Sequence, residues 1–132
     1  MKKYIDTNIF LRFIDGDTDC VSFLKKIVEG EKSYRVLAVV ASELVWVLGS
    51  SYKYKRQKIV GIVKAILMMK GLIWTADCNL IKAMDWFEKG MAKYNDCVIA
   101  SAMKEGDIIV SFDKEFDRFE KIKRVEPKDL LA

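Results

Sequence analysis

The amino-acid sequence contains no histidine, and this absence excludes several kinds of catalytic and metal site. Serine–histidine–aspartate and cysteine–histidine catalysis both need an imidazole to move protons, so neither is available in its usual form. Only three cysteines are present, widely spaced and without a CxxC pair, which argues strongly against a zinc site of the usual Cys/His kind. Any catalysis must therefore use carboxylates, lysines, hydroxyls, a thiol or a bound metal ion.

Proline is also scarce, with Pro127 the single example, and no Pro/Gly/Ser-rich linker or repeat interrupts the chain. This length suits one compact domain, and we expect a single domain over residues 1–132. The odd, scattered cysteines argue against a disulfide framework and favour a reducing setting. The most apolar later run, Ile59 to Met69, carries Lys64 and is too short to cross a bilayer, and Asp6 interrupts the first apolar residues too early for a signal peptide. We therefore expect a cytoplasmic protein without a membrane segment.

Strand and helix patterns alternate along the chain. Apolar, often β-branched runs predict strands at Lys3–Ile5, Arg35–Val40, Leu72–Thr75 and Ile108–Phe112, with a marginal one at Val125. Capping residues and helical apolar spacings predict helices at Asn8–Ile14, Cys20–Glu29, Ala41–Leu48, Tyr54–Lys70, Asn79–Lys89 and Asn95–Lys104. This alternation predicts an α/β fold, with a central parallel sheet flanked by helices. The pattern leaves the strand order open.

Acidic residues follow three of the predicted strands. Asp6 follows the first strand, Glu43 lies just past the strand that ends near Val40, and Asp113 follows Ile108–Phe112. In parallel α/β sheets, ligands bind beyond the carboxyl ends of the strands. The topology alone therefore places these three acids at one edge of the sheet.

Each acid also has an ordinary structural explanation. Asp6 can cap the following helix, Glu43 can be a first-turn glutamate favoured by the helix dipole, and Asp113 can be a turn residue. Asp96 can be an N-cap, although the helix face that it shares is otherwise apolar and typical of a core. Asp117 is an auxiliary candidate that fits a surface acid better. Taken singly, none of these residues identifies a function.

Four short segments nevertheless stand in a characteristic order: Tyr4-Ile5-Asp6-Thr7-Asn8, Glu43 at a helix start, Asn95-Asp96-Cys97-Val98-Ile99-Ala100, and Ser111-Phe112-Asp113-Lys114-Glu115-Phe116. In this order the sequence resembles the PIN domain family, and in particular the small VapC-type toxin ribonucleases. The resemblance implies a three-layer α/β/α fold and an active-site set of Asp6, Glu43, Asp96 and Asp113. It also implies that Thr7, Asn8 and Ser111 support these acids, that the chain forms a homodimer and that an antitoxin protein is a partner.

Gathered carboxylates repel one another and are hard to keep ionised without a cation. Oxygen-only ligands suit a hard ion, Mg²⁺ or Mn²⁺. We expect Asp6 and Asp96 to be the main metal ligands and Asp113 to complete the shell. Glu43 is expected to hold and deprotonate a water beside the metal, while the hydroxyls of Thr7 and Ser111 fix the carboxylates. The hypothesis is a divalent-metal-dependent endoribonuclease that hydrolyses phosphodiester bonds as the toxin of a toxin–antitoxin pair.

A formal charge of +4 permits binding to RNA but does not require it. The basic, aromatic stretch around Lys53, Lys55 and Arg56 is a candidate for gripping single-stranded RNA through phosphates and base stacking. A solvated loop and helix start explains the same stretch.

Other functions remain open at this stage. A haloacid-dehalogenase-like phosphatase also has an aspartate after its first strand, but it needs a second aspartate where this chain has Asn8. A PIN nuclease acting in RNA processing or quality control fits the same motifs. A non-catalytic PIN-like or receiver-like interaction module, with the acids as caps and surface charges, would differ by failing to bind Mn²⁺.

Overall fold

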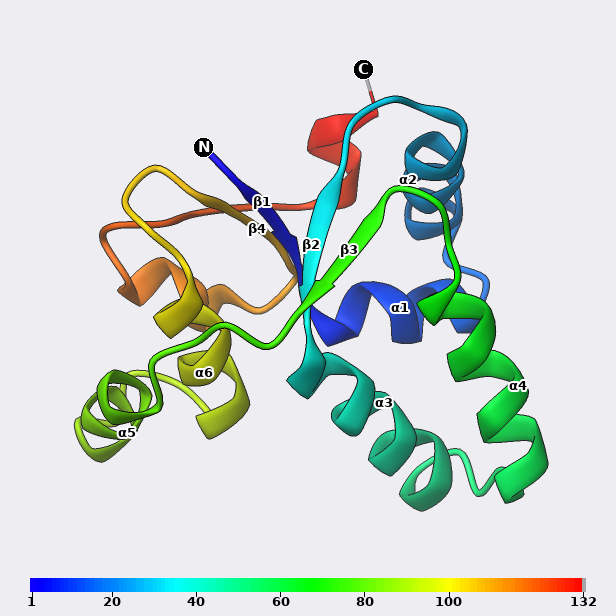
Figure 1. Ribbon diagram of the computed structural model, residues 1–132, viewed down its shortest axis with the longest axis horizontal. Coiled ribbons are helices and arrows are strands. Elements are labelled where there is room, and N and C mark those ends of the chain that lie inside the picture. The colour runs from blue at the N-terminus through cyan, green and yellow to red at the C-terminus, as the bar shows by residue number, and fades with distance from the viewer. Residues whose placement is uncertain (132) are drawn as a thin grey trace.

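The computed structural model describes residues 1–131 and confirms the α/β fold (Figure 1). Five strands form one sheet in the order β3-β2-β1-β4-β5, and each neighbouring pair is parallel. The strands are β1 (Lys3–Ile5), β2 (Tyr34–Leu37), β3 (Leu72–Thr75), β4 (Ile108–Val110) and β5 (Lys123–Val125). The marginal strand expected at Val125 is therefore present, as the edge strand beside β4.

Helices cover both faces of this sheet, as expected for a three-layer α/β/α arrangement. In Figure 1, α1, α2 and α4 lie on one side of the sheet, and α5 and α6 lie on the other. Within residues 1–131 no helix is long and apolar enough to span a bilayer. The helices are α1 (Thr7–Ile14), α2 (Thr18–Glu29), α3 (Ala38–Ser50), α4 (Arg56–Leu67), α5 (Leu80–Glu88) and α6 (Tyr94–Ala102), with short 3-10 helices η1 (Lys114–Arg118) and η2 (Pro127–Leu130).

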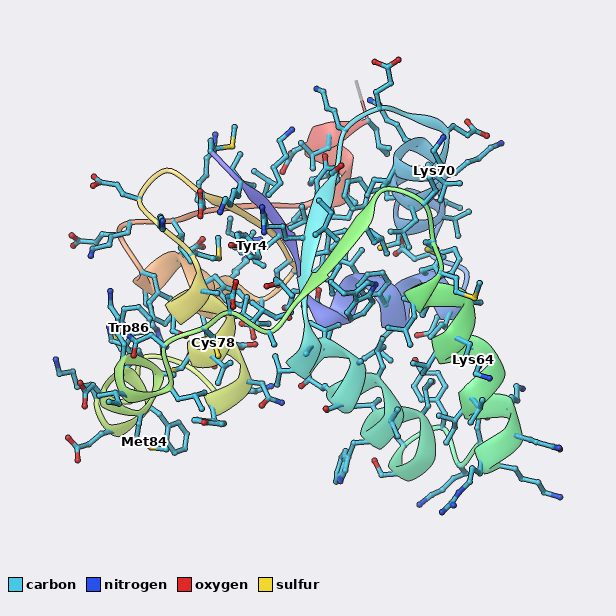
Figure 2. All side chains as sticks on the ribbon, in the orientation of Figure 1. Tyr4, Lys64, Lys70, Cys78, Met84 and Trp86 are labelled. Atoms are coloured by element: carbon cyan, nitrogen blue, oxygen red, sulfur yellow. The ribbon has the colours of Figure 1, made fainter. Side chains whose placement is uncertain are left out.

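The hydrophobic core lies around β1 and β4, two neighbouring inner strands of the sheet. Asp6 follows β1 and Asp113 follows β4, so these strands bring the two acids together. Ile5, Ile109 and Val110 are almost fully buried, and Tyr4, labelled near the centre of Figure 2, is 4% exposed. Ile5 pairs with Val110, and the backbone N–H of Asp6 donates to the Val110 carbonyl oxygen at 3.1 Å. The carboxyl ends of β1 and β4 are therefore neighbours at one edge of the sheet.

The strand predicted at Arg35–Val40 is wrong in its second half. β2 ends at Leu37, and α3 begins at Ala38. Val40 lies in α3 and its side chain is fully buried in the core. This packing outweighs the β-propensity of its branched side chain. Glu43 therefore lies beyond the first turn of α3, and stabilisation by the helix dipole does not explain it.

Other helix ends also differ from prediction. α4 is shorter at both ends than the predicted Tyr54–Lys70. α6 begins at Tyr94 with Lys93 as its N-cap, so neither Asn95 nor Asp96 caps it. The short helix η1 had no sequence prediction, because a single 3-10 turn carries no periodic signal.

Candidate active site

Asp6 lies at the junction of β1 and α1 and both caps the helix and faces a cavity. Its side chain is 3% exposed. One carboxylate oxygen accepts the backbone N–H of Thr7 at 2.8 Å, and the other accepts the hydroxyl of Ser111 at 2.6 Å. Asp6 therefore caps α1, and it also lines the cavity that the other predicted acids line.

Ser111 connects the first and last motifs. Its hydroxyl donates to Asp6 and accepts the side-chain N–H of Asn8 at 3.2 Å and the backbone N–H of Asp113 at 3.0 Å. Ser111 thus contacts the Asp6 carboxylate directly, and Asn8 contacts Ser111. Thr7 contacts the same carboxylate through its backbone, since its buried hydroxyl has no hydrogen-bond partner within the described part of the chain.

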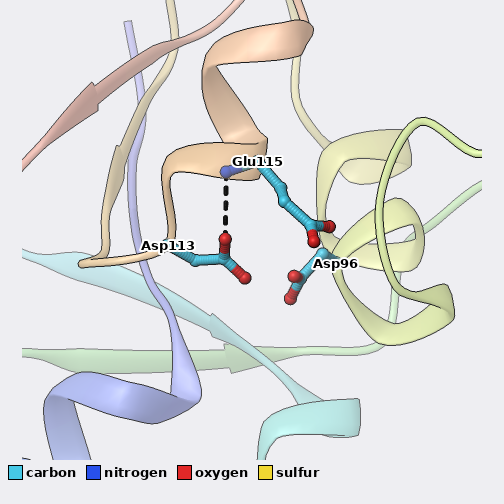
Figure 3. Close-up of side chains that lie close together, drawn as sticks. All are labelled: Asp96, Asp113 and Glu115. Atoms are coloured by element: carbon cyan, nitrogen blue, oxygen red, sulfur yellow. Dashed lines mark hydrogen bonds between the residues drawn. The ribbon is translucent and has the colours of Figure 1, made fainter.

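Asp96 and Asp113 come from opposite sides of the cavity. Asp96, in the first turn of α6, is 6% exposed, and its Oδ2 has no hydrogen-bond partner among residues 1–131. Asp113 caps η1 by accepting the backbone N–H of Glu115 at 2.9 Å. Figure 3 shows the carboxylates of Asp96, Asp113 and Glu115 pointing toward one another, and one oxygen from each lies within 4.8 Å of the others.

Glu43 completes the cluster from α3. Its Oε2 accepts the side-chain N–H of Asn95 at 3.4 Å. The cavity has a volume of about 120 Å³. All four predicted acids and two of the predicted supporting residues, Thr7 and Asn8, line the cavity. The other residues that line it are Leu11, Val47 and Lys93.

Burial and mutual repulsion raise the pKa of two of these carboxyl groups. Burial raises the pKa of Asp6 to about 6, and the charges of Glu43 and Asp113 add to this effect, while hydrogen bonds from Ser111 and Thr7 oppose it. Burial likewise raises the pKa of Asp96 to about 9, and Asp6, Asp113 and Glu43 raise it further. Without a cation, the cluster does not hold all its negative charges at neutral pH.

The donor set fits a hard divalent cation. Every candidate ligand in the cluster is a carboxylate, and the buried Oδ2 of Asp96 has no protein partner within the described chain. The most closely spaced acids are Asp96, Asp113 and Glu115. Asp6 lies in the same cavity, but both of its oxygens already accept hydrogen bonds.

Three polar residues of this site were not predicted from the sequence. Glu115 stands two positions after Asp113, and only the tight turn of η1 brings the two carboxylates together. Asn95 precedes Asp96 and its role as a donor to Glu43 depends on where α3 lies. Lys93 lines the cavity as the N-cap of α6, which the predicted helix start had placed elsewhere.

The basic stretch considered for RNA binding lies apart from the acids. It follows the C-terminal end of α3 at Ser50, and Glu43 lies roughly 10 Å before that end along the helix axis, at 1.5 Å per residue. The ammonium of Lys58 lies 3.9 Å from the centroid of the Tyr54 ring, so the face of the ring that it covers is not open for stacking with a base. Asp117 is likewise outside the cluster and pairs with Arg124 at 3.1 Å.

Known proteins resemble this chain over most of its length. A VapC ribonuclease from Aquifex aeolicus (strain VF5) is 28% identical over 123 residues, covering 88% of this chain and 90% of that protein. VapBC-1 from nontypeable Haemophilus influenzae contains a chain with the same fold, with a TM-score of 0.69 at 12% identity, covering 97% of this chain and 99% of that one.

A further solved structure, VapBC2 from Rickettsia felis bound to a DNA fragment from their promoter, gives a TM-score of 0.69 at 16% identity. That match covers 96% of this chain and 98% of the other. At such low identity these structures support the fold alone. The family model described as "PIN domain" matches residues 3–122, which contain every acid of the cavity, and the chain therefore belongs to the PIN domain family.

Proposed function

We propose that this protein is a divalent-metal-dependent endoribonuclease that hydrolyses phosphodiester bonds. The observation that carries the proposal is the cluster of buried carboxylates beyond β1 and β4, with the Oδ2 of Asp96 free to take a ligand. The similarity to a VapC ribonuclease supports RNA as the substrate class.

In this proposal, Asp96 and Asp113 hold Mg²⁺ or Mn²⁺, with Glu115 beside them and Asp6 deeper in the cavity. When bound, such an ion supplies positive charge that polarises a phosphate and acidifies a nearby water. Asp96, whose pKa is raised to about 9 by burial and by the charges of its neighbours, would ionise at neutral pH once a cation offsets those charges.

The remaining residues move or hold protons and fix orientation. Glu43 is partly exposed at the cavity, where its carboxylate can accept a proton from an attacking water. Asn95 orients Glu43 by a 3.4 Å hydrogen bond. Ser111, held by Asn8, keeps the Asp6 carboxylate in one position.

The test is cleavage of labelled single-stranded and structured RNA in Mg²⁺, Mn²⁺ or EDTA. We expect Asp96→Asn to lower the cleavage rate at least about 100-fold, since it removes a ligand rather than an outer contact. Asp85→Asn, a change of the same charge on the exposed face of α5, is the control and should cut normally. Equal cleavage by Asp96→Asn, or cleavage that persists in EDTA, would show that another site or a contaminant is responsible.

We also propose that the chain is the toxin of a toxin–antitoxin pair. Its relative is a VapC ribonuclease, and its structural neighbours come from VapBC structures, some of them bound to DNA. If the proposal is correct, a small protein encoded beside this one should bind the chain and suppress RNA cleavage. Cleavage that continues in a stoichiometric mixture of the two would favour a role in RNA processing.

The same proposal includes a homodimer formed through α5. This helix exposes a row of large apolar side chains at helical spacing: Leu80, Ile81, Met84 and Phe87. Such a row on a short surface helix is typical of an interaction surface. Met84 is labelled on the outer side of α5 in Figure 2.

A further inference from the structure

Lys93 is a positively charged side chain that lines the acidic cavity and has no part in the function proposed above. It is the N-cap residue of α6. Its backbone N–H donates to Oε2 of Glu115 at 3.2 Å, and its carbonyl oxygen accepts the backbone N–H of Cys97 at 3.0 Å. The backbone of Lys93 is thereby fixed between η1 and α6, at the edge of the cavity, while its side chain is exposed.

The ammonium group of Lys93 forms no ion pair with the described residues, 1–131. Both ion pairs of residues 1–131 belong to Arg124, so no carboxylate oxygen of the described chain lies within 4.0 Å of the Lys93 ammonium. Among the residues that line the cavity, all within the described chain, it is the one cation beside four acids. A cation that stays unpaired next to these acids is available to a ligand.

The cavity itself selects for a small, charged group. At about 120 Å³ it is well below the roughly 300–1,000 Å³ of pockets that enclose a drug-sized ligand, so a base or sugar must lie outside it. A phosphate group can approach, but the surrounding carboxylates repel it. In water this repulsion is about 1 kcal/mol for each pair of charges 4 Å apart, and it is larger near a protein surface. A cation at the rim opposes it.

We propose that Lys93 binds a backbone phosphate of the RNA at the mouth of the cavity and holds the strand against the acids. This inference rests on the ribonuclease function proposed above and assigns its substrate contact. Because an ammonium bound to a neighbouring phosphate makes the same contact before and during bond cleavage, Lys93 acts on substrate binding and leaves the chemical step unchanged.

Steady-state kinetics provide the first test. Lys93→Met should raise KM about tenfold, the usual scale for loss of one charge-assisted contact, with kcat within about twofold of the unmutated value. Lys93→Arg should restore KM. Lys89→Met removes the same charge from the exposed end of α5 and should leave both constants unchanged. An unaltered KM in Lys93→Met, or a fall in kcat alone, would overturn the inference.

Binding without cleavage provides the second test and separates this inference from the nuclease proposal. In the Asp96→Asn background with EDTA, affinity for a fluorescent single-stranded RNA is measured over a range of salt concentrations. Removal of one phosphate contact should reduce the slope of log affinity against log salt by about 0.7 in Lys93→Met and not in Lys89→Met.

The two proposals can then fail independently. If the unmutated protein cuts no RNA but Lys93→Met still reduces the salt slope, the nuclease proposal fails and the phosphate contact stands. If the protein cuts RNA and Lys93→Met keeps its KM and its slope, the nuclease stands and the role of Lys93 is refuted. If the unmutated protein cuts no RNA and no RNA binding is detected, both proposals are overturned.

Discussion

At the scale of single residues, the carboxyl group of Asp96 determines how the metal-free protein responds to pH. Burial and neighbouring charges raise its pKa to about 9, above the ordinary value of 3.8 that the unfolded chain would show. Between these values the folded protein binds a proton that the unfolded chain releases. Stability in this window therefore falls as the pH rises, and Asp6, with its pKa raised to about 6, contributes in the same direction.

The corresponding prediction concerns thermal unfolding in EDTA. The Tm of the unmutated protein should fall from pH 5 to pH 9, and Asp96→Asn should weaken this dependence. At pH 8 the variant should melt about 4–8 °C higher, since about 1–2 kcal/mol corresponds to that range in a domain of this size. Mn²⁺ should raise the Tm of the unmutated protein but not that of Asp96→Asn.

Asp85→Asn again provides the control, because Asp85 is exposed on α5 and should change neither the pH dependence nor the response to Mn²⁺. A variant Asp96→Asn that melts lower than the unmutated protein in EDTA would show that the carboxyl group stabilises the apo fold, contrary to this account.

Several of these residues could be predicted because parallel strands align their carboxyl ends. Asp6 and Asp113 were predicted from strand positions, and the structure brings both to one cavity. Glu115 and Lys93 could not be predicted in this way. The 3-10 turn of η1 places Glu115 beside Asp96, and the N-cap position of α6 places Lys93 at the cavity. Neither feature leaves a periodic signal in the sequence.

At the scale of elements, boundaries were predicted well wherever capping chemistry and apolar pattern agreed. β3 matches its prediction, and the side chain of Asp17 caps α2 by accepting the backbone N–H of Cys20 at 3.0 Å. The junction of β2 and α3 was mispredicted because Val39 and Val40 have β-branched side chains, which favour strands, but lie in the first turn of α3. Local propensity cannot reveal which neighbour a buried valine will meet.

Gly71, just before β3, gives a prediction at this scale. Its φ is +90°, and an added Cβ would lie 2.7 Å from Cγ2 and 3.0 Å from the carbonyl oxygen of Ile27 in α2. Gly71→Ala should therefore lower the free energy of unfolding by about 2–4 kcal/mol, through backbone strain together with overpacking. Urea denaturation measures the change.

Gly61→Ala is the matched control, because Gly61 lies inside α4 and the added methyl group would meet no atom within 4 Å apart from its chain neighbours and the adjacent helix backbone. It should stabilise the protein by about 0.5–1 kcal/mol, the usual advantage of alanine in a helix. If both substitutions shifted the unfolding midpoint equally, the close packing of α2 against this turn would not be the cause.

At the scale of the whole molecule, the exposed row on α5 leads to a prediction about assembly. Ile81 is 79% exposed and Met84 is 51% exposed, and both are costly to leave in water. We expect the unmutated chain to sediment as a dimer at micromolar concentration and Ile81→Lys to sediment as a monomer. Val60→Lys, on α4, also replaces an exposed apolar residue and should remain dimeric. A monomeric unmutated chain would refute the α5 dimer.

The pairing of β1 with β4 also decides when the site comes into existence during synthesis. Ser111, which fixes Asp6, lies 105 residues later in the chain, and its carbonyl oxygen is in turn held by Arg124 of β5. Because the ribosome makes the N-terminal segment first, a growing chain carries its first acid long before the others. Until β4 and β5 have emerged, the nascent polypeptide has scattered carboxylates and no assembled centre. The ribonuclease activity that we propose would therefore be absent while the chain is still attached to the RNA that encodes it.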